Sequence, residues 1–381
     1  MKIEQRKWSD ETGWANFSPL TLGSAANLVL VFGATKILKS KALLSDIKTF
    51  YPEAHILGCS TAGEILDTQV SDDTLVVTAI RFEYTRLKFA KVNLIKMEGG
   101  SFQAGAELAK SLGGPDLVHV FTLSDGISVN GSELVKGLVS FLPEGVSVTG
   151  GLAGDADRFS ETVVLHGGIK PEKGTIAALG LYGTHLKAGY GCFGGWDPFG
   201  PERLVTRANA NVLYELDGRS ALELYKEYLG EHAKGLPAAG LLFPLSVRTE
   251  ENAKPLVRTI LAVNEKDQSM TFAGDIPEGA HARLMKANFD RLIDGAAKAA
   301  KANRAALGSA PPDLAILISC VGRKLVLRQR TEEEVEAVRD NLGKKTALTG
   351  FYSYGEICPA AKDGRAELHN QTMTITTLAE T

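Results

Sequence analysis

The feature that most limits how this chain can fold is a pattern that occurs three times. Each copy has a short apolar strand, an amphipathic helix and a second strand that ends at a glycine. The first strands are LVLVF (28–32), LVHVF (117–121) and LAILI (314–318), and the glycines, Gly58, Gly150 and Gly350, follow 30, 33 and 36 residues after each begins. These lengths predict right-handed parallel crossovers, and continuously apolar first strands are typical of a sheet covered on both faces.

Alternating segments follow each glycine and predict antiparallel strands, so we expect mixed sheets. Thr331 and Glu334 have the spacing of a capping box, which predicts the start of the third helix. Residues 186–290 form a different segment, with strands around LKAGYGCF and LVTRAN, a helix in RSALELYKEYL after the turn Asp217-Gly218, and a hairpin in LVRTILAVNEKDQSMTFAG. A long helix follows, from about Arg283 to Asn303. The predicted fold is α/β, with repeated β-α-β units and two domains, 1–189 and 190–381.

The loops after the first and third glycines share a second pattern, because GCSTAGEI and GFYSYGEI both match G-x-x-[ST]-x-G-E-I. Ligands of open α/β sheets bind beyond the carboxyl ends of parallel strands, where glycine lets backbone N–H groups come close. The candidate ligand-binding residues are Gly58, Cys59, Ser60, Thr61, Gly63, Glu64, Gly150, Gly151, Asp155, Tyr352, Ser353, Gly355 and Glu356. Their carboxylates, hydroxyls and amides can hold a small polar ligand. The alternative is that the acids bond only to their own loops.

Spacing excludes several classes of enzyme. GCSTAG is neither G-x-G-x-x-G nor G-x-x-x-x-G-K-[ST], so the phosphate cradle of dinucleotide and P-loop proteins is missing. Nor is it G-x-S-x-G, since Gly63 lies three residues after Ser60. Cys59 is the candidate nucleophile of an unrecognised hydrolase or transferase, although no motif ties a histidine to it. We therefore expect a protein that is not an enzyme.

Charge and hydropathy predict a soluble, cytoplasmic protein. The formal net charge is -3, and Lys and Arg are not interleaved with aromatic residues as in a nucleic-acid groove. The N-terminus lacks the apolar core of a signal peptide, and no later apolar run approaches the length of a membrane span. The four cysteines, Cys59, Cys192, Cys320 and Cys358, include no C-x-x-C pair, which predicts reduced thiols.

The segments GCSTAGEI, GGLAGD, GFYSYGEI and LHNQT together resemble the signature segments of the FIST (F-box and intracellular signal transduction) family over nearly the whole chain. His369 and Asn370 of LHNQT join the candidate ligand-binding residues. The resemblance implies an N-terminal and a C-terminal FIST domain that sense a small ligand, such as an amino acid. It also implies a separate sensor histidine kinase or cyclic-di-GMP enzyme as the partner that the protein regulates.

The segment from GGWDPFG to LLFPL further resembles the NosP subgroup of this family. Members of that subgroup bind haem and report nitric oxide to a kinase, so the resemblance implies haem b as a cofactor; the alternative is a sensor for an amino acid or another small metabolite. Haem needs an axial ligand, and we expect His232 or His281 in that role. Cys358, which precedes Pro359, is an alternative thiolate ligand. The contrary expectation is that these histidines are surface or structural residues, as we expect for His119 inside its strand.

Overall fold

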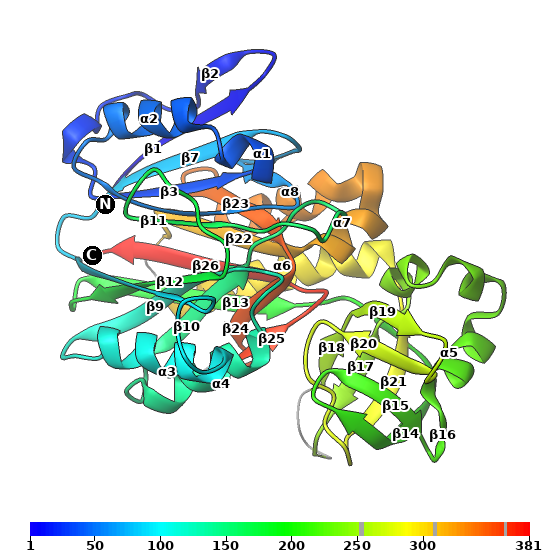
Figure 1. The fold of residues 1–381 in the computed structure, drawn as a ribbon. Coiled ribbons are helices and arrows are strands. Elements are labelled where there is room, and N and C mark those ends of the chain that lie inside the picture. The colour runs from blue at the N-terminus through cyan, green and yellow to red at the C-terminus, as the bar shows by residue number, and fades with distance from the viewer. Residues whose placement is uncertain (251–254, 308–310, 362–363) are drawn as a thin grey trace.

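The computed structural model describes residues 1–250, 255–307, 311–361 and 364–381. Three six-stranded sheets stand around a common centre and carry helices on their outer sides, while an eight-stranded sheet with one helix forms a separate lobe (Figure 1). Both termini lie on the side of the molecule away from that lobe. The predicted mixed α/β fold is confirmed.

Each predicted β-α-β unit is present, with a helix joining two parallel strands. The strand pairs are β3 (Leu28–Gly33) with β4 (His55–Ser60), β9 (Leu117–Ser124) with β10 (Ser147–Leu152), and β22 (Leu314–Cys320) with β23 (Ala347–Ser353). The connecting helices are α2 (Lys41–Phe50), α4 (Gly131–Phe141) and α8 (Thr331–Leu342). Gly58, Gly150 and Gly350 take the same register position, opposite Val31, Thr122 and Leu317. The repeat predicted from the sequence is therefore a structural repeat.

Antiparallel strands complete the three sheets. The first sheet, β11-β4-β3-β7-β1-β2, adds β1 (Lys2–Ser9), β2 (Gly13–Asn16), β7 (Leu75–Arg81) and β11 (Val164–His166). The second, β25-β24-β10-β9-β12-β8, adds β8 (Arg86–Asn93), β12 (Thr175–Tyr182), β24 (Gly355–Pro359) and β25 (Ala366–His369). The third, β13-β26-β22-β23-β5-β6, adds β5 (Glu64–Leu66), β6 (Gln69–Ser71), β13 (Leu186–Phe193) and β26 (Met373–Glu380). The further helices of this part are α1 (Thr35–Leu38), α3 (Ser101–Leu112), α6 (Phe289–Leu307) and α7 (Val321–Leu327), with 3-10 turns at Gly23–Ala25 and Arg328–Arg330.

The three units exchange strands in a closed ring. The β5-β6 hairpin follows β4 of the first unit but pairs with β23 of the third. The β24-β25 hairpin follows β23 but pairs with β10 of the second unit, and β11 follows β10 but pairs with β4 of the first. Each unit therefore completes the sheet of another, and the ring closes on itself.

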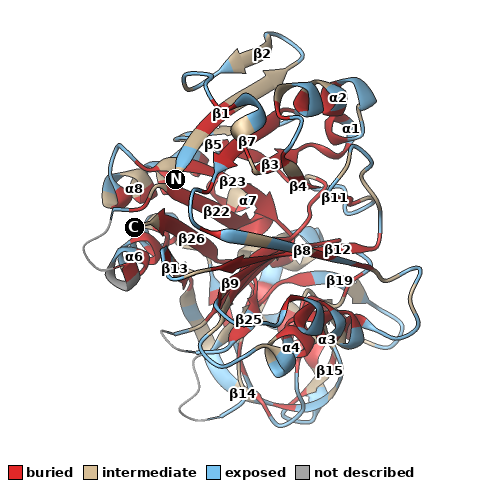
Figure 2. Cartoon of the chain, turned by 90° about the vertical axis from the view of Figure 1, so that its left-hand side faces the viewer, coloured by how far each residue is buried: buried red, intermediate tan, exposed pale blue. Residues whose placement is uncertain are grey.

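Apolar side chains fill both faces of these sheets. The inner faces meet in a central core that draws on all three units, for example through Phe32, Phe121 and Ile318. The outer faces pack against the helices, as where Leu44 and Ile47 of α2 cover the first sheet. Figure 2 shows this burial as a continuous buried centre with exposed helix surfaces around it. The continuous apolar first strands follow from this double coverage.

Residues 197–286, called the insert domain below, form the separate lobe. They comprise β14 (Asp197–Asn209), β15 (Val212–Leu216), β16 (Arg219–Ser220), α5 (Ala221–Leu229), 3-10 turns at Gly230–Gly235 and Ala238–Leu242, β17 (Leu245–Arg248), β18 (Leu256–Arg258), β19 (Ile260–Asn264), β20 (Ser269–Phe272) and β21 (His281–Lys286). The sheet is antiparallel and encloses its own apolar core. The domain leaves and rejoins the chain at neighbouring points, since Asp197 pairs with Lys286.

Three expectations need correction. LKAGYGCF is β13, which pairs with β26 and belongs to the third sheet instead of to the separate segment. The helix expected from Arg283 begins only at Phe289, because Arg283 lies in β21 between β14 and β17. His281, which would lie just before that expected helix, is likewise in β21, as its first residue.

The capping box at the start of α8 is also corrected, although the helix does begin at Thr331. Thr331 donates to the carbonyl of Arg328. The Glu334 carboxylate accepts bonds from Arg323 at 2.7 and 3.0 Å and from Tyr352 at 2.6 Å. Both Arg323 and Glu334 are completely buried, so the glutamate balances a buried guanidinium instead of capping the helix.

Candidate functional site: a cavity at the ends of the parallel strands

The three glycine-rich loops meet at the carboxyl ends of the parallel strands and interlock. The Ala62 amide donates to the Tyr352 carbonyl at 2.8 Å, the Tyr354 amide to the Leu152 carbonyl at 3.2 Å, and the Gly154 amide to the Ser60 carbonyl at 2.9 Å. The three bonds join equivalent positions in successive units, so they repeat around the ring of exchanged strands. The loops therefore form one rigid platform.

Glu64 and Glu356 occupy equivalent places in this platform. Glu64 accepts a bond from the Thr61 hydroxyl and bonds from the amide and hydroxyl of Thr74 at 3.1 and 2.7 Å. Glu356 accepts from Ser353 at 2.6 Å and from the amide and hydroxyl of Thr372 at 3.2 and 2.9 Å. These contacts confirm that both carboxyls accept bonds from their loops out of contact with water.

Burial sets the charge of these two acids. Despite the hydrogen bonds that favour the carboxylate, burial raises the pKa of Glu64 to about 7 and that of Glu356 to about 8. Near neutral pH a large share of both groups therefore carries a proton.

Asp155 holds the second loop and keeps its charge. Burial alone would raise its pKa, but hydrogen bonds from Arg158, Thr35 and Ser160 outweigh that effect and lower the pKa. The Arg158 guanidinium donates to one carboxylate oxygen at 2.6 and 3.1 Å. Asp155 therefore fixes the loop that leads to Phe159.

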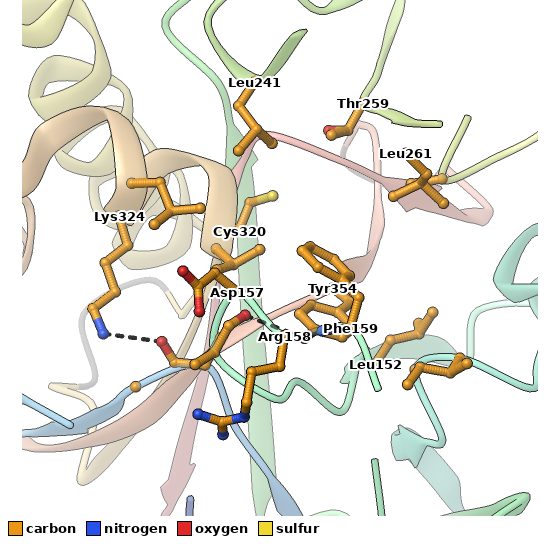
Figure 3. A pocket seen from close by; sticks show the side chains of 18 of the residues that line it. Leu152, Asp157, Arg158, Phe159, Leu241, Thr259, Leu261, Cys320, Lys324 and Tyr354 are labelled. Atoms are coloured by element: carbon orange, nitrogen blue, oxygen red, sulfur yellow. Dashed lines mark hydrogen bonds between the residues drawn. The ribbon is translucent and has the colours of Figure 1, made fainter. Parts of the chain in front are cut away.

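A cavity of about 1520 Å³ opens above this platform, and the insert domain forms its other side. The platform contributes Thr61, Gly63, Glu64, Asp72, Asp73, Asp157, Arg158, Phe159, Cys320, Lys324, Arg328 and Tyr354, together with the start of α4. The insert domain contributes Leu241, Leu242, Thr259, Ile260, Leu261 and Phe272. Figure 3 shows Leu241, Thr259 and Leu261 facing the pair formed by Phe159 and Tyr354. The volume exceeds that of a typical small-molecule site, so there is room for a ligand and ordered water.

The cavity brings together only part of the set predicted from the sequence. Thr61, Gly63 and Glu64 line it. Gly58, Gly150 and Gly350 lie inside the sheets, where a Cβ atom would stand 1.8–2.1 Å from a carbonyl oxygen of the neighbouring strand. The others that do not line it, Cys59, Ser60, Gly151, Asp155, Tyr352, Ser353, Gly355, Glu356, His369 and Asn370, are buried around the platform. Their role in binding stays a prediction.

The cysteines and His369 also lie away from the cavity, except Cys320, which lines it. The four cysteines are buried, and none of them forms a disulfide within the described residues. Burial raises the pKa of Cys59 well above its usual value, which disfavours the thiolate that a nucleophile needs. His369 donates from Nε2 to the Cys358 carbonyl at 2.9 Å. His119 bonds Ser147 and Thr149, as expected of a core histidine.

Sequence reasoning missed Asp72, Asp73, Phe159, Lys324, Tyr354 and the whole contribution of the insert domain. One signal was available for the first two, because SDDT (71–74) and HNQT (369–372) precede equivalent strands. Asp73 and Gln371 both have positive φ, of 53° and 61°. Asn370 and Gln371, the counterparts of the two aspartates, are fully buried, and their side-chain amides have no partner within the described chain.

The residues of the cavity do not fit haem. No histidine lines it in the described parts of the chain. His232 is exposed in the 3-10 turn after α5, and His281 is half-exposed beside Glu202 at 3.3 Å. Burial raises the pKa of Cys320, so it is a neutral thiol. The propionates would also meet Asp73 and Asp157. Within the described ranges, no three His, Cys, Asp or Glu side chains are arranged to hold a metal ion.

Three strand-exchanged α/β units around a shared cavity define the class of fold, and sequence comparison names its family. The chain matches the FIST N domain over residues 27–219 and the FIST C domain over residues 221–359. It therefore belongs to the FIST family, whose domains are signal-transduction sensory domains. The two matches divide at residue 220, and the predicted boundary near residue 190 stays a prediction.

The similar proteins do not indicate a biochemical activity for this chain. An uncharacterized protein of Mycobacterium tuberculosis (strain CDC 1551 / Oshkosh) is 24% identical over 372 residues, covering 92% of this chain and 90% of that protein. An uncharacterized protein of Methanocaldococcus jannaschii is 23% identical, covering 71% of this chain and 56% of its own. A solved chorismatase covers 99% of this chain and 98% of its own at 12% identity and a TM-score of 0.34, too low for any argument. No helix in the described ranges is long and apolar enough to cross a membrane.

Proposed function

We propose that the chain is a non-catalytic sensor whose signal is a small organic molecule bound in the cavity between the loop platform and the insert domain. The observation that carries this proposal is the cavity itself, which all three units and the insert domain build together. Internal hydrogen bonds hold its platform rigid, as those of Glu64 and Asp155 illustrate. Such a rigid surface is suited to binding a ligand, and burial disfavours the Cys59 thiolate that covalent catalysis would need.

The placement of the insert domain supports a way to pass on the signal. It is joined to the core by two adjacent connections, at Asp197 and Lys286, and has its own apolar core. A ligand that touches both sides of the cavity would favour one position of this domain over others. We infer that a separate histidine kinase or cyclic-di-GMP enzyme reads that position, in keeping with a sensory FIST protein.

Haem-based sensing of nitric oxide is less well supported than sensing of an organic metabolite. His232 and His281 lie outside the cavity lining, and His281 instead approaches Glu202 at 3.3 Å. A Soret band after reconstitution with haem, shifted by nitric oxide and lost in His232→Ala or His281→Ala, would favour the haem sensor instead.

A thermal-shift screen of the full chain against a library of cellular metabolites tests the proposed function. At least one compound should raise Tm, since a ligand that binds only the folded state stabilises it. Leu261→Trp, which places an indole in the cavity, should abolish that shift. The matched control is Leu204→Trp, because Leu204 is 40% exposed, Leu261 is 42% exposed, and Leu204 lies outside the cavity. A shift that survives Leu261→Trp would place the binding site elsewhere.

A further inference from the structure

We propose that the ligand of this cavity is a flat aromatic molecule that carries a protonated amine. Its ring would stack on Phe159, and its amine would pair with Asp157 and Asp73. This inference rests on the proposed function, because it names the ligand class of the same cavity.

The ring platform is the first observation. Phe159 and Tyr354 stack with their ring centroids 4.3 Å apart and their planes at 16°. Tyr354 is buried and fixed, since its hydroxyl donates to the Ala156 carbonyl at 3.1 Å and accepts from the Phe159 amide at 3.2 Å. Phe159 is 41% exposed, which leaves part of its ring free toward the cavity. An exposed ring on a rigid support, opposite Leu241 and Leu261, suits a flat apolar molecule (Figure 3).

The charges of the cavity are the second observation. Two of its cationic side chains, Arg158 and Lys324, already pair with carboxylates. Arg158 is held by Asp155 at 2.6 Å. Lys324 pairs with Asp72 and donates to the Ala62 carbonyl at 3.0 Å. These contacts leave both cations engaged within the platform.

The remaining charge is mainly negative. Asp73 and Asp157 are exposed in the cavity and have no hydrogen-bond partner among the described residues, although the charge of Asp73 also helps to raise the pKa of Arg158. Arg328 is the one lining cation in the described ranges without a carboxylate partner. Because Asp155 already pairs with Arg158, the carboxylates of Asp73 and Asp157 outnumber the one remaining base. This excess of negative charge favours a cationic ligand, and the face of Phe159 attracts a cation as well. A phosphate or carboxylate at the same place would meet the two aspartates.

Thr259 is the third and independent observation. Its side chain lines the cavity from the insert domain and is only 6% exposed, yet its hydroxyl has no partner in the described chain. A buried hydroxyl without a partner is costly, so a polar group should meet it in the bound state. A ring N–H or a second heteroatom of the ligand would provide that bond.

Calorimetry of the full chain with three indoles tests the inference. Tryptamine carries the ring and an ammonium group, 3-methylindole carries the ring without charge, and indole-3-acetate carries the ring with a carboxylate. Tryptamine should bind at least about tenfold more tightly than the other two, as expected for one charge-assisted contact.

Matched variants assign the contacts. Asp157→Asn and Asp73→Asn should each weaken tryptamine several-fold and leave 3-methylindole unchanged, whereas Phe159→Ala should weaken both. Asp294→Asn and Phe141→Ala are the controls, because both residues are exposed, Phe141 to 45%, and neither lines the cavity.

Equal or tighter binding of 3-methylindole or indole-3-acetate would overturn the ligand class, as would aspartate variants without effect on tryptamine. If none of the three indoles binds, the ligand class also fails. The proposed function survives that result when a metabolite from the screen still loses its Tm shift in Leu261→Trp. If no metabolite in the screen gives such a Tm shift either, both the ligand class and the proposed function are contradicted.

Discussion

Glu64 is the residue at which the cost of building the loop platform is clearest. Folding moves its carboxyl out of water while giving it donors from Thr61 and Thr74. Burial still prevails and raises the pKa to about 7 from an ordinary 4.5. The folded protein therefore binds a proton that the unfolded chain releases between these two values.

This difference predicts how stability depends on pH. Between about pH 4.5 and 7 the folded state holds up to one proton more at Glu64, so the contribution of Glu64 to the free energy of unfolding falls as pH rises and is constant above about pH 7. The raised pKa corresponds to a loss on the order of 3 kcal/mol. Glu64→Gln, which keeps the shape of the protonated acid, should remove this part of the dependence. Urea unfolding at pH 4, 6 and 8 measures it.

The expected signature is a stability difference, variant minus native protein, that rises from pH 4.5 to 7 and stays constant above. Glu356 contributes a similar fall that the variant retains, since its pKa is also raised by burial, to about 8. Glu107→Gln on the exposed face of α3 is the control and should give parallel curves. Parallel curves for Glu64→Gln itself would mean that Glu64 is ionised in the folded protein.

At the scale of single elements, Gly58 shows why each second strand has a glycine as its fourth residue, inside the strand and not at its end as the sequence pattern predicted. A Cβ atom there would stand 2.1 Å from the Val31 carbonyl oxygen of the parallel neighbour. The obstacle is backbone, so it cannot rotate away as a side chain would. The same close approach occurs at Gly150 and Gly350, which makes it a requirement of the repeated unit.

Gly58→Ala should therefore destabilise the protein by about 3 kcal/mol or more, because β3 and β4 must separate to admit the methyl group. Thermal and urea unfolding measure the loss. Gly168→Ala is the matched control, since no atom lies within 4 Å of its added Cβ and its φ is not positive. That variant should stay within about 0.5 kcal/mol of the native protein. A tolerated Gly58→Ala would show that the strand pair can open at little cost.

The β-α-β units could be predicted because each is local. The apolar strand, the helix stripe and the glycine lie within about 40 residues of one another, and double coverage of the sheet leaves a visible apolar run. The capping box failed because Glu334 faces a buried Arg323, which only the tertiary fold reveals. The onset of α6 failed because β21 gains its strand partners from β14 and β17, far from it in sequence.

On the scale of the whole molecule, the candidate site depends on contacts that no local pattern records. Gly63 and Glu64 could be found from a shared loop motif. Phe159 reaches the cavity only because Tyr354 of another unit lies beneath it. Thr259, between β18 and β19, and Leu261, in β19, join it from the insert domain, and neither belongs to a sequence motif. The exchange of hairpins is equally long-range, since β5 pairs with β23 across most of the chain.

The ring of exchanged strands and the insert domain should therefore be separable. The ring is closed without residues 197–286, and its two ends of chain lie side by side because Asp197 pairs with Lys286. Replacing 197–286 by two glycines should leave a protein that unfolds cooperatively, seen by circular dichroism during heating. It should also have a lower Tm, because Trp196 loses its contact with Met285 and the Leu368 carbonyl loses a 2.9 Å bond from Arg258.

The same deletion should abolish ligand binding, because it removes Leu241, Thr259 and Leu261 and opens the cavity to water. Calorimetry with the metabolite found by the thermal-shift screen measures this loss, and Leu261→Trp serves as the variant that blocks the cavity with the insert domain still present. Retained binding by the deleted protein would place the site on the loop platform alone. Loss of the cooperative transition would show instead that the three units need the insert domain to close their ring.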